Sequence, residues 1–203
     1  DGNQWKLSGG KRYITNADKA HLFTVMARTG GPGAGGVSAF LVPADSPGLS
    51  VGAHEKKMGQ QGAHICDVNF DDVAVPPENM LGAEGEGFKV AMRVLDRGRL
   101  HISAMCVGVA ERLVADAVAY ATERKQFGQA IAEFQLVQAM IADSKTELLA
   151  AKALVLETAA KRDAGENVVL ECAAAKLFAS EMVGRVADRA VQIFGGAGYV
   201  ADY

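Results

Sequence analysis

The segment Glu123-Arg124-Lys125-Gln126-Phe127-Gly128 has the residue types for binding a phosphate next to a flat ring. The guanidinium of Arg124 can give two parallel hydrogen bonds to a phosphate, and Phe127 can lie beneath an aromatic ring system. The same residues suit a helix end, because cations favour the partial negative charge of a helix C-terminus and Gly128 can stop the helix. These six residues alone leave both interpretations open.

A second candidate is the glycine-rich stretch Gln192-Ile193-Phe194-Gly195-Gly196-Ala197-Gly198-Tyr199. One glycine is enough to end a helix, because it adopts the positive φ that lets the backbone reverse. Three glycines in four positions exceed that need. The surplus favours a backbone brought close to a ligand, beside which Gln192 offers both a donor and an acceptor.

Residues 1–80, which should position part of any site, have the short apolar runs and glycine or proline breaks of a β-rich region. Gly9-Gly10 separates residues 4–7 from 12–15, which predicts two short strands joined by a tight turn. A glycine-rich hairpin loop is expected at 29–36. Further strands are expected at 22–27, 37–42, 49–51, 66–70 and 73–75. The pattern predicts an antiparallel β-sandwich or barrel.

Residues 81–203 change to helical periodicity. Apolar side chains recur at steps of three and four over about 85–122, 133–164 and 168–194, which predicts three long helices. Because short loops join them, they should form an antiparallel helical bundle. The fold class is therefore α+β, a β domain at 1–80 followed by a helical domain at 81–203. The apolar faces are too extensive for this chain alone to cover.

The charge and the cysteines argue against several classes of protein. The net charge of -3, with Lys and Arg scattered along the chain, indicates no nucleic-acid or membrane surface. Cys66, Cys106 and Cys172 are far apart in apolar surroundings, which predicts buried free thiols of a reducing compartment, without disulfides or a metal site. A start at Asp1 and a stop at Tyr203 suggest a piece of a longer protein.

Taken in order, the motifs closely resemble the acyl-CoA dehydrogenase family. In that family a middle β domain lies between two α-helical domains, and the resemblance covers most of the β domain and most of the C-terminal bundle. The motifs that carry it are Arg12-Tyr13-Ile14-Thr15-Asn16, Lys57-Met58-Gly59, Phe70-Asp71-Asp72-Val73, Val75-Pro76, Glu78-Asn79-Met80-Leu81-Gly82, Gly87-Phe88, Leu95-Asp96-Arg97-Gly98-Arg99, Arg124-Lys125-Gln126-Phe127-Gly128, Phe134-Gln135 and the terminal glycine turn.

The resemblance implies FAD as the cofactor. Tyr13-Ile14-Thr15 match the segment that lies against the flavin ring, with the threonine hydroxyl near the flavin N5. A strand displays alternate side chains on one face, so Tyr13 and Thr15 could act together. The alternative is an ordinary edge strand. The family's contacts to the ADP part of FAD, held mainly by a neighbouring subunit, match Arg124, Gln126, Phe127, Gln192, Gly195 and Gly196. A homodimer or homotetramer is thereby implied.

The acyl-CoA pocket of the family matches Leu95, Gly98 and Arg99, which share one helix face. For Arg99, a buried ion pair with Asp96 is the competing explanation. The sequence departs from the family at Gly62-Ala63-His64-Ile65, where a small hydroxyl residue commonly contacts the CoA chain. His64 could substitute for that hydroxyl or be merely exposed.

The catalytic base of most of the family is a glutamate downstream of the terminal glycine turn, so here it is expected beyond Tyr203. In the isovaleryl and long-chain branches it occupies the position of Gly98, which has no side chain to abstract a proton. Asp202 matches an acidic residue of the family that is not the base. The 203-residue chain by itself is therefore expected to be inactive.

The resemblance implies FAD-dependent α,β-dehydrogenation of an acyl-CoA thioester to a trans-2-enoyl-CoA, with electrons passed to electron-transfer flavoprotein. The location would be cytoplasmic in a bacterium and the mitochondrial matrix in a eukaryote. A flavin-dependent acyl-CoA oxidase that uses oxygen is one alternative. The other is a noncatalytic helical assembly protein, in which Arg124 and the glycine turn are purely structural.

Overall fold

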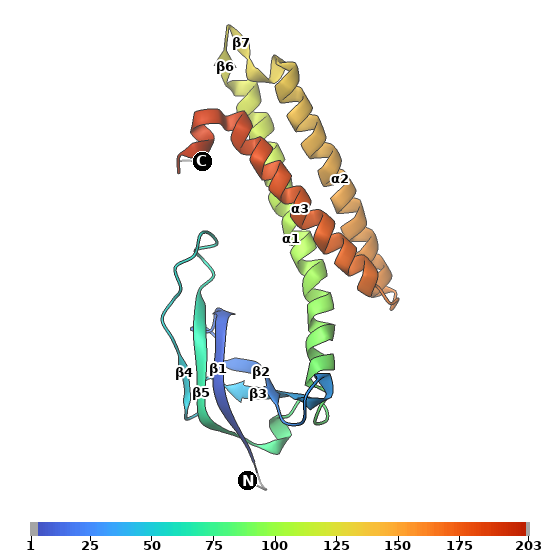
Figure 1. Ribbon diagram of the computed structural model, residues 1–203. Coiled ribbons are helices and arrows are strands. Elements are labelled where there is room, and N and C mark those ends of the chain that lie inside the picture. The colour runs from blue at the N-terminus through green and yellow to red at the C-terminus, as the bar shows by residue number, and fades with distance from the viewer. Residues whose placement is uncertain (1–3, 202–203) are drawn as a thin grey trace. The chain divides into compact units, whose positions relative to one another are not determined.

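The computed structural model describes residues 4–201 and divides into two compact units (Figure 1). The first, Asp1–Arg93, is called the β unit, and the second, Val94–Tyr203, the helical unit. The boundary between them falls within α1 (Gly87–Glu123).

The β unit contains two small antiparallel sheets that share one core. The first sheet has the order β1-β5-β4, in which β1 is Trp5–Thr15, β4 Leu49–Val51 and β5 Ile65–Val75. The second pairs β2 (Leu22–Arg28) with β3 (Val37–Pro43), as the predicted hairpin requires. Short 3-10 turns lie at Ala34–Gly36 and Pro77–Asn79. The antiparallel β prediction is confirmed as two open sheets whose buried side chains include Phe40, Val42, Val68, Val73 and Val75.

The predicted turn at Gly9-Gly10 is wrong. Strand β1 continues through both glycines, which pair with Phe70 and Asn69 of β5. The register shifts between Leu7 and Gly9, and Gly9 has a φ of 137°. The glycines therefore accommodate a β-bulge in a continuous strand, a role that sequence alone does not distinguish from a turn.

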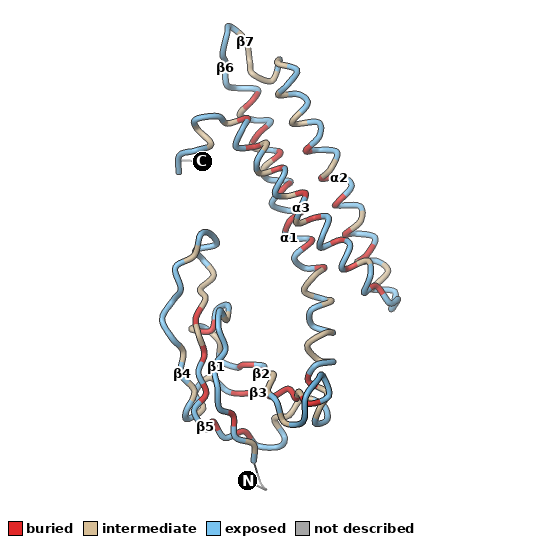
Figure 2. The backbone as a smooth tube through the Cα atoms, viewed as in Figure 1, coloured by how far each residue is buried: buried red, intermediate tan, exposed pale blue. Residues whose placement is uncertain are grey.

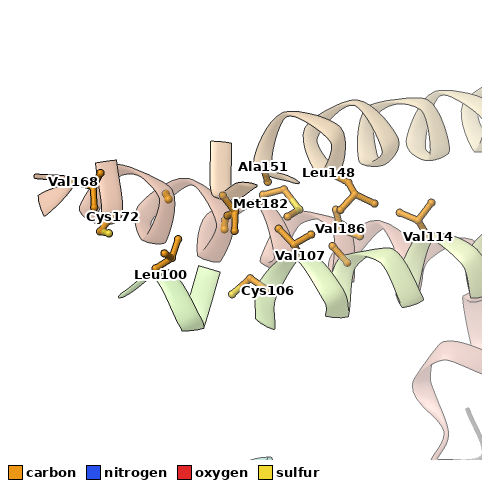
Figure 3. Packing of buried hydrophobic residues seen from close by; sticks show 14 residues of the cluster. Leu100, Cys106, Val107, Val114, Leu148, Ala151, Val168, Cys172, Met182 and Val186 are labelled. Carbon is orange, nitrogen blue, oxygen red and sulfur yellow. The ribbon is translucent and has the colours of Figure 1, made fainter. Parts of the chain in front are cut away.

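The helical unit confirms the three predicted helices. Helix α1 is followed by α2 (Gln135–Asp163) and α3 (Val169–Phe194), and successive helices run antiparallel (Figure 1). Buried side chains from all three helices form its core, among them Val107, Leu148 and Met182 (Figure 3). Ala175 and Ala179 on α3 have no exposed surface, and their small side chains allow the close helix approach.

The connection between α1 and α2 differs from the expected loop. Helix α1 ends at Glu123, and the chain then forms a small hairpin of β6 (Lys125–Gln126) and β7 (Gln129–Ala130). The turn residues Phe127 and Gly128 have φ values of 53° and 82°. Two positive φ angles in a two-residue turn indicate type I′. A 3-10 turn, Ile131–Glu133, leads into α2.

Large apolar residues remain exposed along the helices, as the sequence predicted. Exposed positions recur along all three helices (Figure 2). They include Val94, Val109, Leu136, Leu149, Leu156, Leu170, Leu177 and Val191. Among the described residues, none of the helices has the length and apolar character needed to cross a membrane. Cys66, Cys106 and Cys172 are free and buried, as expected. Burial raises the pKa of the Cys172 thiol.

Candidate functional site

The two candidate motifs of the helical unit meet at one cavity of about 470 Å³. Helices α1 and α3 both end at the same end of the bundle, which brings Arg124 close to the turn after α3 (Figure 1). The rings of Tyr120 and Phe194 stack with centroids 4.3 Å apart and tie the two helix ends together. The cavity is lined by Tyr120, Arg124, Gln126, Ile131, Ile193, Phe194, Gly195, Gly196 and Ala197.

The three glycines of the turn after α3 have different reasons to be glycine. Gly195 has a φ of 59°, and its N–H donates to Gln192 and Val191 as the helix ends. At Gly198 a Cβ would lie 2.8 Å from the carbonyl oxygen of Val191, so the turn leaves no room for one. Gly196 has neither restriction, because a Cβ there would meet nothing within 4 Å. Gly196 is thus the surplus glycine, and it lines the cavity.

Arg124 is fixed through its backbone while its side chain stays available. Its N–H donates to Tyr120 at 2.9 Å, and its carbonyl accepts from Ile131 at 2.9 Å. Within residues 4–201 its guanidinium has no hydrogen bond or ion pair. An exposed cation without a partner, positioned at a cavity, can bind an anion without first breaking an internal contact.

Phe127 occupies the tip of the β6–β7 turn. It is 95 % exposed, contacts Phe134 edge-on at 6.2 Å, and has the positive φ that a non-glycine residue rarely adopts. The type I′ turn requires this φ and leaves the ring exposed at its tip. Neither Phe127 nor the exposed Gln192 is among the residues that line the cavity.

The predicted strand site lies at the end of β1. Tyr13 and Thr15 are exposed and Ile14 packs against the core, so exposure alternates as expected. The strand is nevertheless irregular, because its register shifts between Lys11 and Ile14 and Tyr13 has a φ of 57°. Tyr13 is 60 % exposed, and the Arg12 guanidinium lies over its ring, 4.9 Å from the ring centre. The end of β1 therefore exposes both an aromatic ring and, at Thr15, a hydroxyl.

The third predicted group lies on α1. Leu95 is half exposed, Gly98 has open space around it, and Arg99 is partly buried. Arg99 Nη1 lies 2.5 Å from Asp96 Oδ1, so the ion pair considered from the sequence forms, although both side chains keep some exposure.

His64 is not an isolated exposed histidine. Its Nδ1 lies 2.8 Å from Asp18 Oδ2, and His54 Nε2 lies 3.2 Å from the same oxygen. The hydrogen bond with His64 lowers the pKa of Asp18 to about 2. Sequence reasoning missed this cluster and the stacking of Tyr120 on Phe194, since neither pair is close in sequence.

Comparison with known families matches both parts of the chain. Residues 1–73 match the acyl-CoA dehydrogenase middle domain, and residues 85–203 match the acyl-CoA dehydrogenase C-terminal domain. The chain belongs to the acyl-CoA dehydrogenase family. The resemblance seen in the motifs is thereby confirmed.

Relatives within the acyl-CoA dehydrogenase family are similar over the whole chain. It is 42% identical to cyclohexane-1-carbonyl-CoA dehydrogenase of Geobacter metallireducens, over 100% of this chain and 53% of that protein. It is 43% identical to the CarC subunit of the caffeyl-CoA reductase-Etf complex of Acetobacterium woodii, over 100% of this chain and 54% of that protein. The butyryl-CoA dehydrogenase structure from Megasphaera elsdenii has a TM-score of 0.96 and 42% identity, over 98% of this chain and 52% of that one.

The chain spans about half the length of the curated relatives it matches. Acyl-CoA dehydrogenases are flavoproteins, so the cavity at the helix ends can be tested against the phosphates and rings of a flavin dinucleotide. The observations fit such a group. Arg124 has no side-chain partner among residues 4–201, and Gly196 leaves the backbone open to close approach. Phe127 offers an exposed ring outside the cavity.

Proposed function

We propose that the protein containing this chain is an FAD-dependent acyl-CoA dehydrogenase. In the reaction an acyl-CoA thioester loses its α-hydrogen as a proton to a base and its β-hydrogen as a hydride. The product is a trans-2-enoyl-CoA, and the bound FAD supplies the two-electron acceptor for the hydride. The observation that carries this proposal is the meeting of Arg124 and Gly196 at one cavity in a chain of this family.

In this proposal the helical unit binds the ADP part of the cofactor. Arg124 and Gln126 donate hydrogen bonds to phosphate oxygens, and the backbone at Gly195 and Gly196 allows those oxygens to come close. Phe127 and Gln192 lie outside the cavity, so their proposed contacts are to the parts of the cofactor that extend beyond it. The exposed position of Phe127 suits contact with a group that another subunit presents, which supports a homodimer or homotetramer.

The end of β1 is proposed to contact the flavin. Tyr13 would lie against the ring system, and the Thr15 hydroxyl would donate a hydrogen bond to it. Ile14 anchors this segment by packing against the core of the β unit. The task of these residues is to orient the ring relative to the substrate, because reactants that are already oriented lose less entropy on reaching the transition state.

The substrate is proposed to pass along α1 beside Leu95, Gly98 and Arg99. The open space at Gly98 leaves room for an acyl chain, and the ion pair with Asp96 holds the Arg99 side chain in place. Gly98 cannot be the base, because it has no side chain to accept a proton, and no residue of this chain is proposed for that role. Asp202, which we do not assign as the base, lies outside the described residues.

Electron-transfer flavoprotein is the proposed electron acceptor. The name of the Acetobacterium relative places it in a complex with such a protein, which supports the partner. The direction of electron flow follows from the proposed dehydrogenation. An oxidase would instead reduce oxygen to peroxide.

The experiment uses the full-length protein. We expect it to purify with flavin absorbance, to lose that absorbance anaerobically on addition of one acyl-CoA from a series, and to reduce electron-transfer flavoprotein. Rapid formation of peroxide in air would show that the protein is an oxidase and not a dehydrogenase. Purified protein without flavin that cannot be reconstituted with FAD would overturn the proposal.

A further inference from the structure

Three metal-ligating side chains of different types converge in the β unit. Asp18 lies in the turn after β1, His54 between β4 and β5, and Cys66 in β5. One ligand atom from each side chain lies within 4.8 Å of the other two. No motif of the proposed dehydrogenase uses this cluster, which we call the Asp-His-Cys cluster.

Backbone hydrogen bonds hold the three segments in place. The N–H of Asn16 donates to His64 at 2.7 Å, and the N–H of Glu55 donates to Ile65 at 2.9 Å. Cys66 also pairs with Ile14 in the β1–β5 ladder. The chain around each ligand is thereby fixed before any ion binds, which lowers the entropy cost of assembling a site.

The polar groups of the cluster are unevenly satisfied. Asp18 Oδ2 is close to His64 Nδ1 at 2.8 Å, His54 Nε2 at 3.2 Å and the exposed Lys19 Nζ at 3.3 Å. Asp18 Oδ1 is buried and has no hydrogen-bond partner within residues 4–201. Buried polar atoms without partners are rare in native proteins and point to a missing ion or water. Cys66 beside it is fully buried with a free thiol.

We propose that the Asp-His-Cys cluster binds a zinc ion through a carboxylate oxygen of Asp18, His54 Nε2 and the Cys66 sulfur. Zinc is the common ion that accepts oxygen, nitrogen and sulfur together, whereas calcium and magnesium select oxygen alone. Cys66 binds as the thiolate and releases its proton to solvent. The exposed side at His54 leaves the fourth position to water.

The geometry needs only a small closure. Zinc–ligand bonds of about 2.0–2.3 Å place tetrahedral ligand atoms about 3.5 Å apart. Ligand atoms of the cluster that are now as much as 4.8 Å apart must therefore approach one another by roughly 1 Å. The His54 side chain can supply that movement by rotating, because it is exposed, while its backbone stays in place. His64 orients the carboxylate through its hydrogen bond to Asp18 and does not bind the metal. Bound zinc therefore ties the segment before β5 to the turn that follows Thr15.

The test uses full-length FAD-loaded protein, stripped with a chelator, dialysed against zinc chloride and analysed for zinc and flavin. We expect about one zinc ion per chain in the wild type. Cys66→Ala and His54→Ala should lose it while keeping their flavin, which shows that they have folded. His21→Ala is the matched control, because His21 is an exposed histidine of the same unit outside the cluster, and it should keep its zinc.

Two further measurements separate a built site from surface binding. Cobalt should give a thiolate charge-transfer band in the difference spectrum of wild type against Cys66→Ala. His64→Phe should weaken zinc binding by about 10–100-fold, as for loss of an orienting partner. Equal zinc in wild type, Cys66→Ala and His54→Ala would mean adventitious surface binding only and would overturn the proposal, as would flavin-loaded wild type that binds no zinc.

Discussion

The cavity at the helix ends and the Asp-His-Cys cluster of the β unit are assembled in different ways. The cavity is built from two continuous motifs, each located where a helix ends. The cluster takes one residue from each of three separate segments and depends on strand register and turns. A site at helix ends is therefore visible in sequence as a motif, whereas a site between strands becomes visible only after the strands pair.

The two regions also differ in what supports them. The cavity depends on helix packing, since a buried cluster that includes Ala121, Ala190 and Ile193 holds the helix ends, and the main core with Met182 holds the rest of the bundle. The cluster depends on backbone hydrogen bonds only a few residues from its ligands. Substitutions in the main core of the helical unit should therefore lower the free energy of unfolding, although none of the residues of that core belongs to a motif.

Met182→Ala should give the largest effect. Met182 is fully buried, and truncating such a side chain removes apolar contacts and leaves a cavity, at a cost of about 2–5 kcal/mol in the free energy of unfolding. Chemical denaturation of the full-length protein measures it. Leu170→Ala, at an α3 position that is 78% exposed, is the control and should change stability by only about 0.5 kcal/mol. Equal losses in both variants would contradict the dependence on the core.

Arg124→Ala tests the motif itself. Loss of a charged hydrogen-bond donor should weaken FAD binding by about 10–100-fold, while the free energy of unfolding without FAD stays nearly constant, because Arg124 has no internal partner within residues 4–201. Flavin titration measures the FAD affinity, and chemical denaturation followed by far-ultraviolet circular dichroism measures the free energy of unfolding. Lys145→Ala, at an exposed α2 cation away from the cavity, should retain FAD. Unchanged FAD affinity in Arg124→Ala would favour a purely structural helix end.

Two glycines of one turn separate fold from function. Gly198→Ala should lower the free energy of unfolding by about 1–3 kcal/mol, because its Cβ would crowd the Val191 carbonyl. Gly196→Ala meets open space, so it should leave stability unchanged and reduce FAD affinity alone. Paired denaturation and flavin titration measure both effects. A stability loss at Gly196 as large as at Gly198 would remove the argument for a ligand.

Glu147→Gln should give the smallest effect, and one that depends on pH. Glu147 joins α2 to α3 through Arg185 and Arg189 at 2.8 and 2.9 Å. Burial alone would raise the pKa of Glu147, but the hydrogen bonds from Arg189 and Arg185 outweigh burial and lower it. The carboxylate thus stabilises the fold above the ordinary glutamate pKa, by about 1 kcal/mol. Denaturation at a series of pH values should show wild type and variant converging as the solution is acidified.

The helices and the motifs of the helix-end cavity could be predicted from the sequence. The three helices begin and end near the predicted residues. The motifs that hold Arg124 and Gly196 are visible in the sequence, but only the structure shows that both lie at one cavity, and their role in cofactor binding stays a prediction. Helical periodicity is local, because each residue bonds to another four positions away. The roles of Tyr13, Thr15 and Leu95 stay predictions that rest on the family.

Only the tertiary structure decided that Gly9-Gly10 continue a strand, that a hairpin follows α1, and that His64 meets Asp18. It also showed that Gly195 and Gly198 must be glycine for the turn to form whereas Gly196 need not be, although the three look equivalent in sequence. The physical reason is the range of the interactions. Strand pairing and side-chain convergence join residues far apart in the chain, so local patterns carry no signal of the register that brings them together.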